Sequence, residues 1–174
     1  MFSTLRASLR RPRTPLSSAK LLALVVLIAA LCSCEKSGHE HLVDARSSLA
    51  SASYDDAVSA AQAGLVASPS KPDAWGLELV KLEAHARAGN GEDAKQQISQ
   101  LARLHPDRIP ASEYFATAHQ LKMAGKGTEA IEVLDLGMRR FPDNEVLNAM
   151  IGASSESADV SSAELEMLKS LGYL

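Results

Sequence analysis

After residue 39, the apolar positions show no sustained alternation with polar ones, the pattern that a half-buried strand requires. This part of the chain has 23 Ala and 16 Leu residues but only 13 Val, Ile and Thr residues together. Alanine and leucine favour helices, whereas β-branched residues favour strands. Breaks occur at Pro69/Pro72, 89–91, Pro106/Pro110, 125–127, Pro142 and 152–162. Because proline and glycine end helices, these breaks predict an all-α fold with helices of about 12–16 residues.

The breaks recur at a regular interval. Alanines at 57, 94 and 130 are 37 and 36 residues apart, and each lies twelve residues before a proline, at 69, 106 and 142. A period of this size is typical of stacked helix pairs, each too small to bury its own apolar face.

These positions resemble the tetratricopeptide repeat, a 34-residue helix pair. Residues 111–144 match the unit without insertion at Tyr114, Ala118, Leu121, Gly125, Ala130, Gly137 and Pro142. Residues 75–108 and 38–71 match at fewer positions, and Trp75 lies one turn earlier than the family's tryptophan. The resemblance implies a repeat domain over 39–155 with about three helix pairs and an extra helix near 144–155. Alanine and glycine at helix crossings would let the backbones approach to about 8–9 Å.

The resemblance also implies a binding groove on the concave face, formed by the first helix of each pair. Carried over, the groove positions are Leu42, Arg46, Leu49, Leu79, Glu83, Arg87, Phe115, His119 and Lys122. The family's carboxylate clamp is absent, because Leu42, Leu79 and Phe115 stand at its positions. We therefore expect a groove that binds a helix or an extended peptide of another protein. A solvated face, or a face covered by the C-terminal helix, is the alternative.

Residues 156–174 are predicted to form a linker and a capping helix. Ser161 and Glu164 fit a capping box, Gly172 fits a helix end, and Leu165, Leu168 and Leu171 recur every three residues. A helical stack needs its open end covered, which favours a cap. However, residues 168–174 also resemble a short segment near the C-terminal end of bacterial sulfatases, which would suit a docking tail. The sulfatase nucleophile motif is absent.

The first 33 residues are typical of an export signal. They carry five basic and no acidic residues, and 21–31 form an uncharged, almost wholly aliphatic run that is short for a membrane span. Leu31, Cys32, Ser33 and Cys34 follow and resemble the lipobox of bacterial lipoproteins. This resemblance implies a signal peptide over 1–33, lipid on Cys34 (with palmitate among its acyl chains) and a tether over 34–38. An uncleaved signal anchor is the alternative.

Residues 34–174 have 13 basic and 21 acidic side chains, which argues against nucleic-acid binding. Glu35 follows the lipid-bearing cysteine, and by resemblance to enterobacterial lipoproteins it implies the periplasmic side of the outer membrane. The predicted function is therefore a lipid-anchored scaffold that binds an envelope protein or peptide. An accessory lipoprotein of pilus, secretion or outer-membrane assembly is one form of it.

We expect no catalysis, cofactor or small-molecule substrate. His39 and His41 offer two imidazoles for a metal, but no third ligand of matching spacing follows. His85, His105 and His119 have no nucleophile at a recognisable spacing. A metal-binding or hydrolytic envelope protein is the alternative from another class.

Overall fold

The computed structural model describes residues 36–174, and this part of the chain is all-α, as the sequence predicts. Its helices are α2 (Gly38–Ala50), α3 (Tyr54–Val66), α4 (Lys71–Ala88), α5 (Gly91–Leu104), α6 (Ala111–Met123), α7 (Gly127–Arg140), α8 (Glu145–Glu156) and α9 (Ser162–Leu171). A short 3₁₀ segment, η1 (Pro106–Arg108), joins α5 to α6. The predicted breaks fall at or beside the ends of helices, except that the break predicted over 152–162 begins too early, because α8 continues through Gly152 to Glu156.

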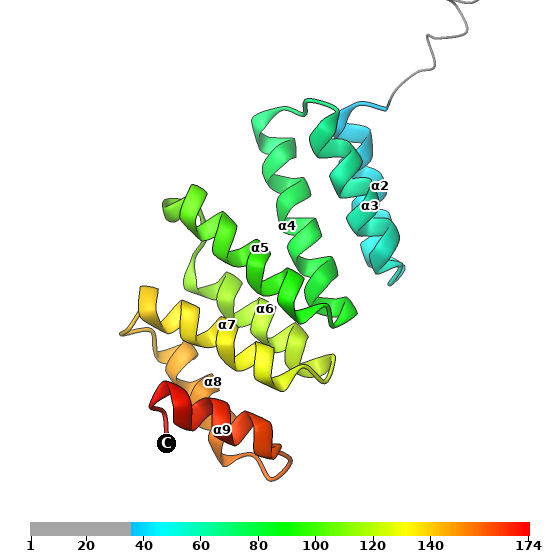
Figure 1. Cartoon of the computed structure of the whole chain (residues 1–174). Coiled ribbons are helices and arrows are strands. Elements are labelled where there is room, and N and C mark those ends of the chain that lie inside the picture. Colours follow the sequence, from blue (N-terminus) through cyan, green and yellow to red (C-terminus); the bar gives the residue numbers. More distant parts are fainter. Residues whose placement is uncertain (1–35) are drawn as a thin grey trace, which may run out of the picture. The chain divides into compact units, whose positions relative to one another are not determined.

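The helices pack in two alternating series (Figure 1). Helices α2, α4, α6 and α8 each contact the next member of that series, and so do α5, α7 and α9. Short turns join α2 to α3, α4 to α5 and α6 to α7 as helical hairpins. Helix α9 packs against α7 and so continues the second series. The sequence predicts α8 and a C-terminal helix, but not that the C-terminal helix packs against α7.

The recurring alanines and glycines lie where helices approach most closely. Ala57 and Ala94 are fully buried, and Ala130 is almost so. A Cβ added to Gly137 would lie 2.8 Å from the Cβ of Tyr114, and the matching position Gly64 is crowded by Leu77. Real side chains avoid such distances, which confirms the prediction of close contacts at these positions.

The turns of the three hairpins share one backbone conformation. Ala52, Gly89 and Gly125 are 37 and 36 residues apart, with φ of 59°, 73° and 75°. This left-handed region carries a steric cost for every residue with a Cβ. The first hairpin therefore has a strained alanine where the other two have glycine.

Two groups of buried side chains form the core. One lies between α2, α3 and the side of α4 that carries Leu77, Val80 and Ala84, and it also includes Leu42 and Leu49. The other extends from Leu82 on α4 through to α9. Helix α4 is the element common to both.

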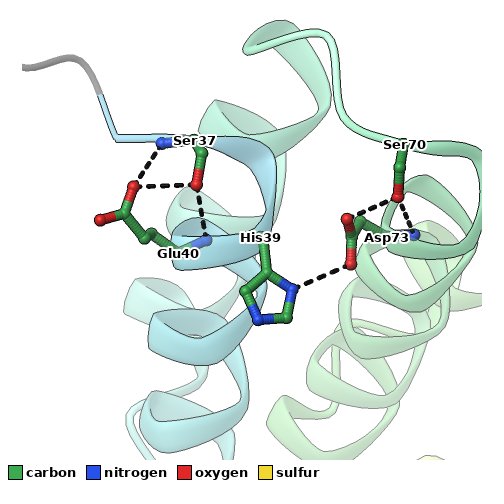
Figure 2. Close-up of polar contacts among 5 residues, drawn as sticks. All are labelled: Ser37, His39, Glu40, Ser70 and Asp73. Atoms are coloured by element: carbon green, nitrogen blue, oxygen red, sulfur yellow. Dashed lines mark hydrogen bonds and ion pairs between the residues drawn. The ribbon is translucent and has the colours of Figure 1, made fainter.

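The first turns of α2 and α4 are capped and bridged (Figure 2). Ser37 and Glu40 form a capping box on α2, and Ser70 accepts a hydrogen bond from the Asp73 amide on α4. His39 Nδ1 lies 3.2 Å from Asp73 Oδ1 and so links the two helix ends. The Ser70 hydroxyl, and next His39, lower the pKa of Asp73.

The C-terminal helix begins and ends as predicted. Ser161 and Glu164 form a capping box, and Gly172 has a φ of 84°. Leu168 is fully buried and Leu171 partly buried, but Leu165 remains 37% exposed. Leu165 therefore contributes less to the cap than its three-residue spacing suggests, because α9 turns one narrow side toward α7.

Candidate groove across α4, α6 and α8

An apolar groove lies between α6 and α8. Its volume is about 650 Å³, and its walls are Phe115, His119, Lys122 and Met123 on α6 and Glu145, Val146, Ala149, Met150 and Ala153 on α8. Met123 is 74% exposed and Val146 is 55% exposed, although both side chains are apolar. We call this the α6/α8 groove. An exposed apolar concavity of this kind is typical of a binding surface.

The periodicity of the helix that forms each wall explains why these side chains face outward. On α6, Tyr114, Ala118 and Leu121 turn into the core. On α8, Leu147 and Ile151 do the same. The residues beside them in sequence, Phe115 and His119 on α6 and Val146 and Met150 on α8, consequently line the groove. The rings of Phe115 and His119 stack with their centroids 6.1 Å apart.

A smaller and more polar pocket lies on the other side of α6, against α4. Its volume is about 280 Å³, and it is lined by Leu79, Leu82, Glu83 and Ala86 on α4 and Glu113, Ala116, Thr117 and Gln120 on α6. We call this the α4/α6 pocket. Glu83 and Arg87 form an ion pair, with 2.6 Å between Oε1 and Nη2. Burial, and then the charge of Glu83, raise the pKa of Glu113.

The predicted groove residues fall into three places. Phe115, His119 and Lys122 line the α6/α8 groove together. Leu79 and Glu83 line the α4/α6 pocket, where Arg87 is joined to Glu83. Arg46 is exposed on α2 and lines neither cavity.

The expectation that Leu42 and Leu49 lie on an open groove is wrong. Leu42 is 4% exposed and Leu49 is 8% exposed, and both belong to the core between α2, α3 and α4. The close approach of α2 to α4 explains this, because the Leu42 side chain packs over Gly76, whose missing Cβ leaves room for it. The cavities of this face therefore begin at α4, with the α4/α6 pocket, and do not extend to α2.

The α8 wall and the Glu113 side of α6 are not among the groove positions that the sequence predicts. The 34-residue length of the repeat unit is the sequence signal that points to the α8 wall. The sequence predicts α8 as the first helix of a fourth, incomplete pair. The residue 34 positions after Phe115 is Ala149, which lines the groove. Extending the carried-over positions by one more repeat would have reached it.

Among residues 36–174, no group of three His, Cys, Asp or Glu side chains is placed to hold a metal ion. His39 faces Asp73 across the α2–α4 junction. Within the same residues, no helix is both long and apolar enough to cross a membrane. The predicted signal peptide over 1–33 and the lipid site at Cys34 lie outside the described residues.

No protein-family model, curated protein or solved structure matches this chain.

Proposed function

We propose that the protein is a lipid-anchored scaffold of the tetratricopeptide type. It binds another envelope protein through the face formed by α4, α6 and α8. The observation that carries the proposal is the α6/α8 groove, where the exposed Met123 and Val146 and the half-buried Phe115 and Met150 form an apolar concavity. A stable fold has no need of such a surface, so a partner is the physical reason for it.

Two further features support a repeat scaffold. The hairpins recur with buried alanines and left-handed turns 36 and 37 residues apart. Alternate helices contact one another along the stack, which is the arrangement that leaves one series of helices free to bind. The lipid on Cys34 and the periplasmic side of the outer membrane are the proposed site of action.

Photo-crosslinking in cells tests the proposal. A photoreactive amino acid replaces Val146 in the groove or, as the matched control, Val66 at the end of α3, which is 84% exposed. We expect the same envelope protein to crosslink repeatedly at position 146 and not at 66. A Met123→Asp substitution, at a groove side chain that is 74% exposed, should remove this product while the protein stays folded. Equal crosslinking at both positions, or none at 146, would overturn the proposal.

A further inference from the structure

We propose that the face of α4, α6 and α8 binds an extended peptide segment that has a Lys or Arg side chain three residues from a large apolar side chain. The cation enters the α4/α6 pocket beside Glu83 and Glu113, and the apolar side chain enters the α6/α8 groove. This inference rests on the proposed function, because it assumes that the protein binds a partner through this face.

The α4/α6 pocket has the chemistry of a site for one long basic side chain. Leu79, Leu82, Ala86 and Ala116 provide apolar walls, and the carboxylates of Glu83 and Glu113 belong to the same pocket. Lysine and arginine bury their methylene stems against apolar surface and keep the charged head at a polar partner. A volume of about 280 Å³ is below the usual range for whole small-molecule ligands, so it suits a single side chain.

The charge of this pocket is incomplete without a ligand. Arg87 is joined to Glu83, and the remaining polar side chains, Thr117 and Gln120, are neutral. Glu113 has no ion pair with any residue between Lys36 and Leu174. The pocket therefore holds one uncompensated carboxylate in a half-buried place. A cation from a partner would offset that charge and the cost of its burial.

The α6/α8 groove is suited to the apolar side chain. Phe115, Met123, Val146 and Met150 give it an apolar lining, and methionine adapts to differently shaped ligands. Lys122 and Glu145 have opposite charges at this groove, so it does not attract a basic side chain as the α4/α6 pocket does. This difference in charge determines which of the two side chains enters which cavity.

The distance between the two cavities sets the spacing in the ligand. They lie on opposite sides of α6, and packed helices have axes about 8–10 Å apart. In the polyproline II conformation, residues i and i+3 lie on the same side of the chain, about 9 Å apart. In a β-strand, residues i and i+3 point to opposite sides. The polyproline II conformation therefore fits both cavities with a spacing of three.

Four fluorescent peptides test the inference against full-length protein in detergent micelles. The first contains Lys-Pro-Pro-Phe in a Gly/Ser background. The second has Glu in place of Lys, the third has Ser in place of Phe, and the fourth places Lys and Phe seven residues apart in a helical sequence. Fluorescence anisotropy should show the first peptide binding about tenfold more tightly than any other, as expected for one charged hydrogen bond or one buried aromatic ring.

Variants of the protein assign the cation to its pocket. Glu113→Gln should weaken binding of the Lys-Pro-Pro-Phe peptide about tenfold and abolish its preference over the Glu peptide. Glu166→Gln on α9 makes the same charge change on an exposed residue outside both cavities and should have no effect. Raising the salt concentration should weaken only the pairing with Lys. Circular dichroism confirms that each variant is folded.

The outcomes separate this inference from the proposed function. Equal binding of the Lys and Glu peptides, lost in Val146→Asp but not in Glu113→Gln, would overturn the cation pocket and leave the scaffold function intact. Tightest binding by the helical peptide would overturn the extended conformation. No binding by any peptide would overturn the whole inference, while crosslinking at position 146 judges the proposed function independently.

Discussion

The Tyr173 hydroxyl donates a hydrogen bond to the Asp135 carboxylate, with 3.1 Å between the two oxygen atoms. Tyr173 follows the last residue of α9 by two positions, and Asp135 is a buried residue of α7. Asp135 also pairs with Arg139, at 2.8 Å. Burial, and next the hydrogen bond to Asp135, raise the pKa of Tyr173. The end of the chain is therefore joined to α7 by a specific polar contact as well as by the burial of Leu168.

Tyr173→Phe should lower the free energy of unfolding by about 1 kcal/mol, the usual value of one hydrogen bond. Because the folded-state pKa of Tyr173 is raised, its contribution is complete below pH 10 and is lost as the pH rises through that pKa. Urea denaturation at pH 7 and above pH 10 measures both effects. Tyr54→Phe is the control, since no hydrogen bond of its hydroxyl is found among the described residues. A difference between Tyr173→Phe and wild type that persists unchanged in alkali would contradict this account.

Leu168→Ala should destabilise the protein by about 2–5 kcal/mol, because Leu168 is fully buried against the α7 side of the core. Leu165→Ala on the same helix should cost less than about 1 kcal/mol, since that side chain is 37% exposed. Removal of the residues after Ser162 should destabilise the protein more than either substitution. Thermal melting of the three variants distinguishes a cap from a docking tail. A truncated chain that melts at the wild-type temperature would show that α9 does not cap the stack.

Ala52→Gly should stabilise the protein by about 1 kcal/mol, because it removes the Cβ from a turn with a φ of 59°. The greater freedom of glycine in the unfolded chain offsets part of this gain. Gly125→Ala, at the equivalent turn and with open space around it, should destabilise by a similar amount. Chemical denaturation measures both changes. Opposite signs at the two turns would confirm that their conformation, and not local packing, decides the effect.

Glu113→Gln should make the protein more stable at pH 7 in the absence of a ligand. The raised pKa of Glu113 means that the folded state holds its proton more tightly than the unfolded state. This favourable contribution is complete below the ordinary pKa of 4.5 and disappears as the pH rises through the folded-state value. Melting temperatures of the wild type and the variant should therefore converge at acidic pH and separate at neutral pH. A variant that melts lower than wild type at pH 7 would contradict the account.

Cys34→Ala should abolish lipid attachment and leave the precursor uncleaved, whereas Cys32→Ala should be tolerated. The reason is that the small Ser33 precedes Cys34, while the larger Leu31 precedes Cys32. Metabolic labelling with a radioactive fatty acid measures the lipid. Label that persists in the Cys34→Ala variant would show that Cys34 is not the lipidation site and would point to Cys32 instead.

The local features of this fold could be predicted from the sequence. The capping box of α9, the left-handed Gly172 and the buried alanines at 57, 94 and 130 depend on near neighbours and on a regular spacing. The position of α9 beside α7 could not be predicted, because it depends on contacts between segments 38 residues apart, such as Asp135 and Tyr173.

The α6 part of the candidate site could be predicted from local sequence, but the α2 part could not, because it depends on contacts with another helix. The sequence of α6 resembles the repeat unit without insertion, which predicts Phe115, His119 and Lys122 on one groove, and the structure places these three side chains together. On α2, a helical pattern cannot distinguish an outward leucine from one that a neighbouring helix covers. The burial of Leu42 follows from Gly76 on α4, which allows α2 to approach closely.

The division of the core at α4 has a mechanical consequence. Among the buried residues of their cluster, the side chains of α2 and α3 pack with one another and with Leu77, Val80 and Ala84 on α4. Both cavities, in contrast, are built from α4, α6 and α8. Tension applied to the chain at Lys36 would reach α2 and α3 first. We expect this pair to detach as a separate cooperative unit, with amide protons that exchange earlier than those of α6 and α7. Its detachment would lengthen the proposed tether, while the α6/α8 groove and the α4/α6 pocket would keep their shape.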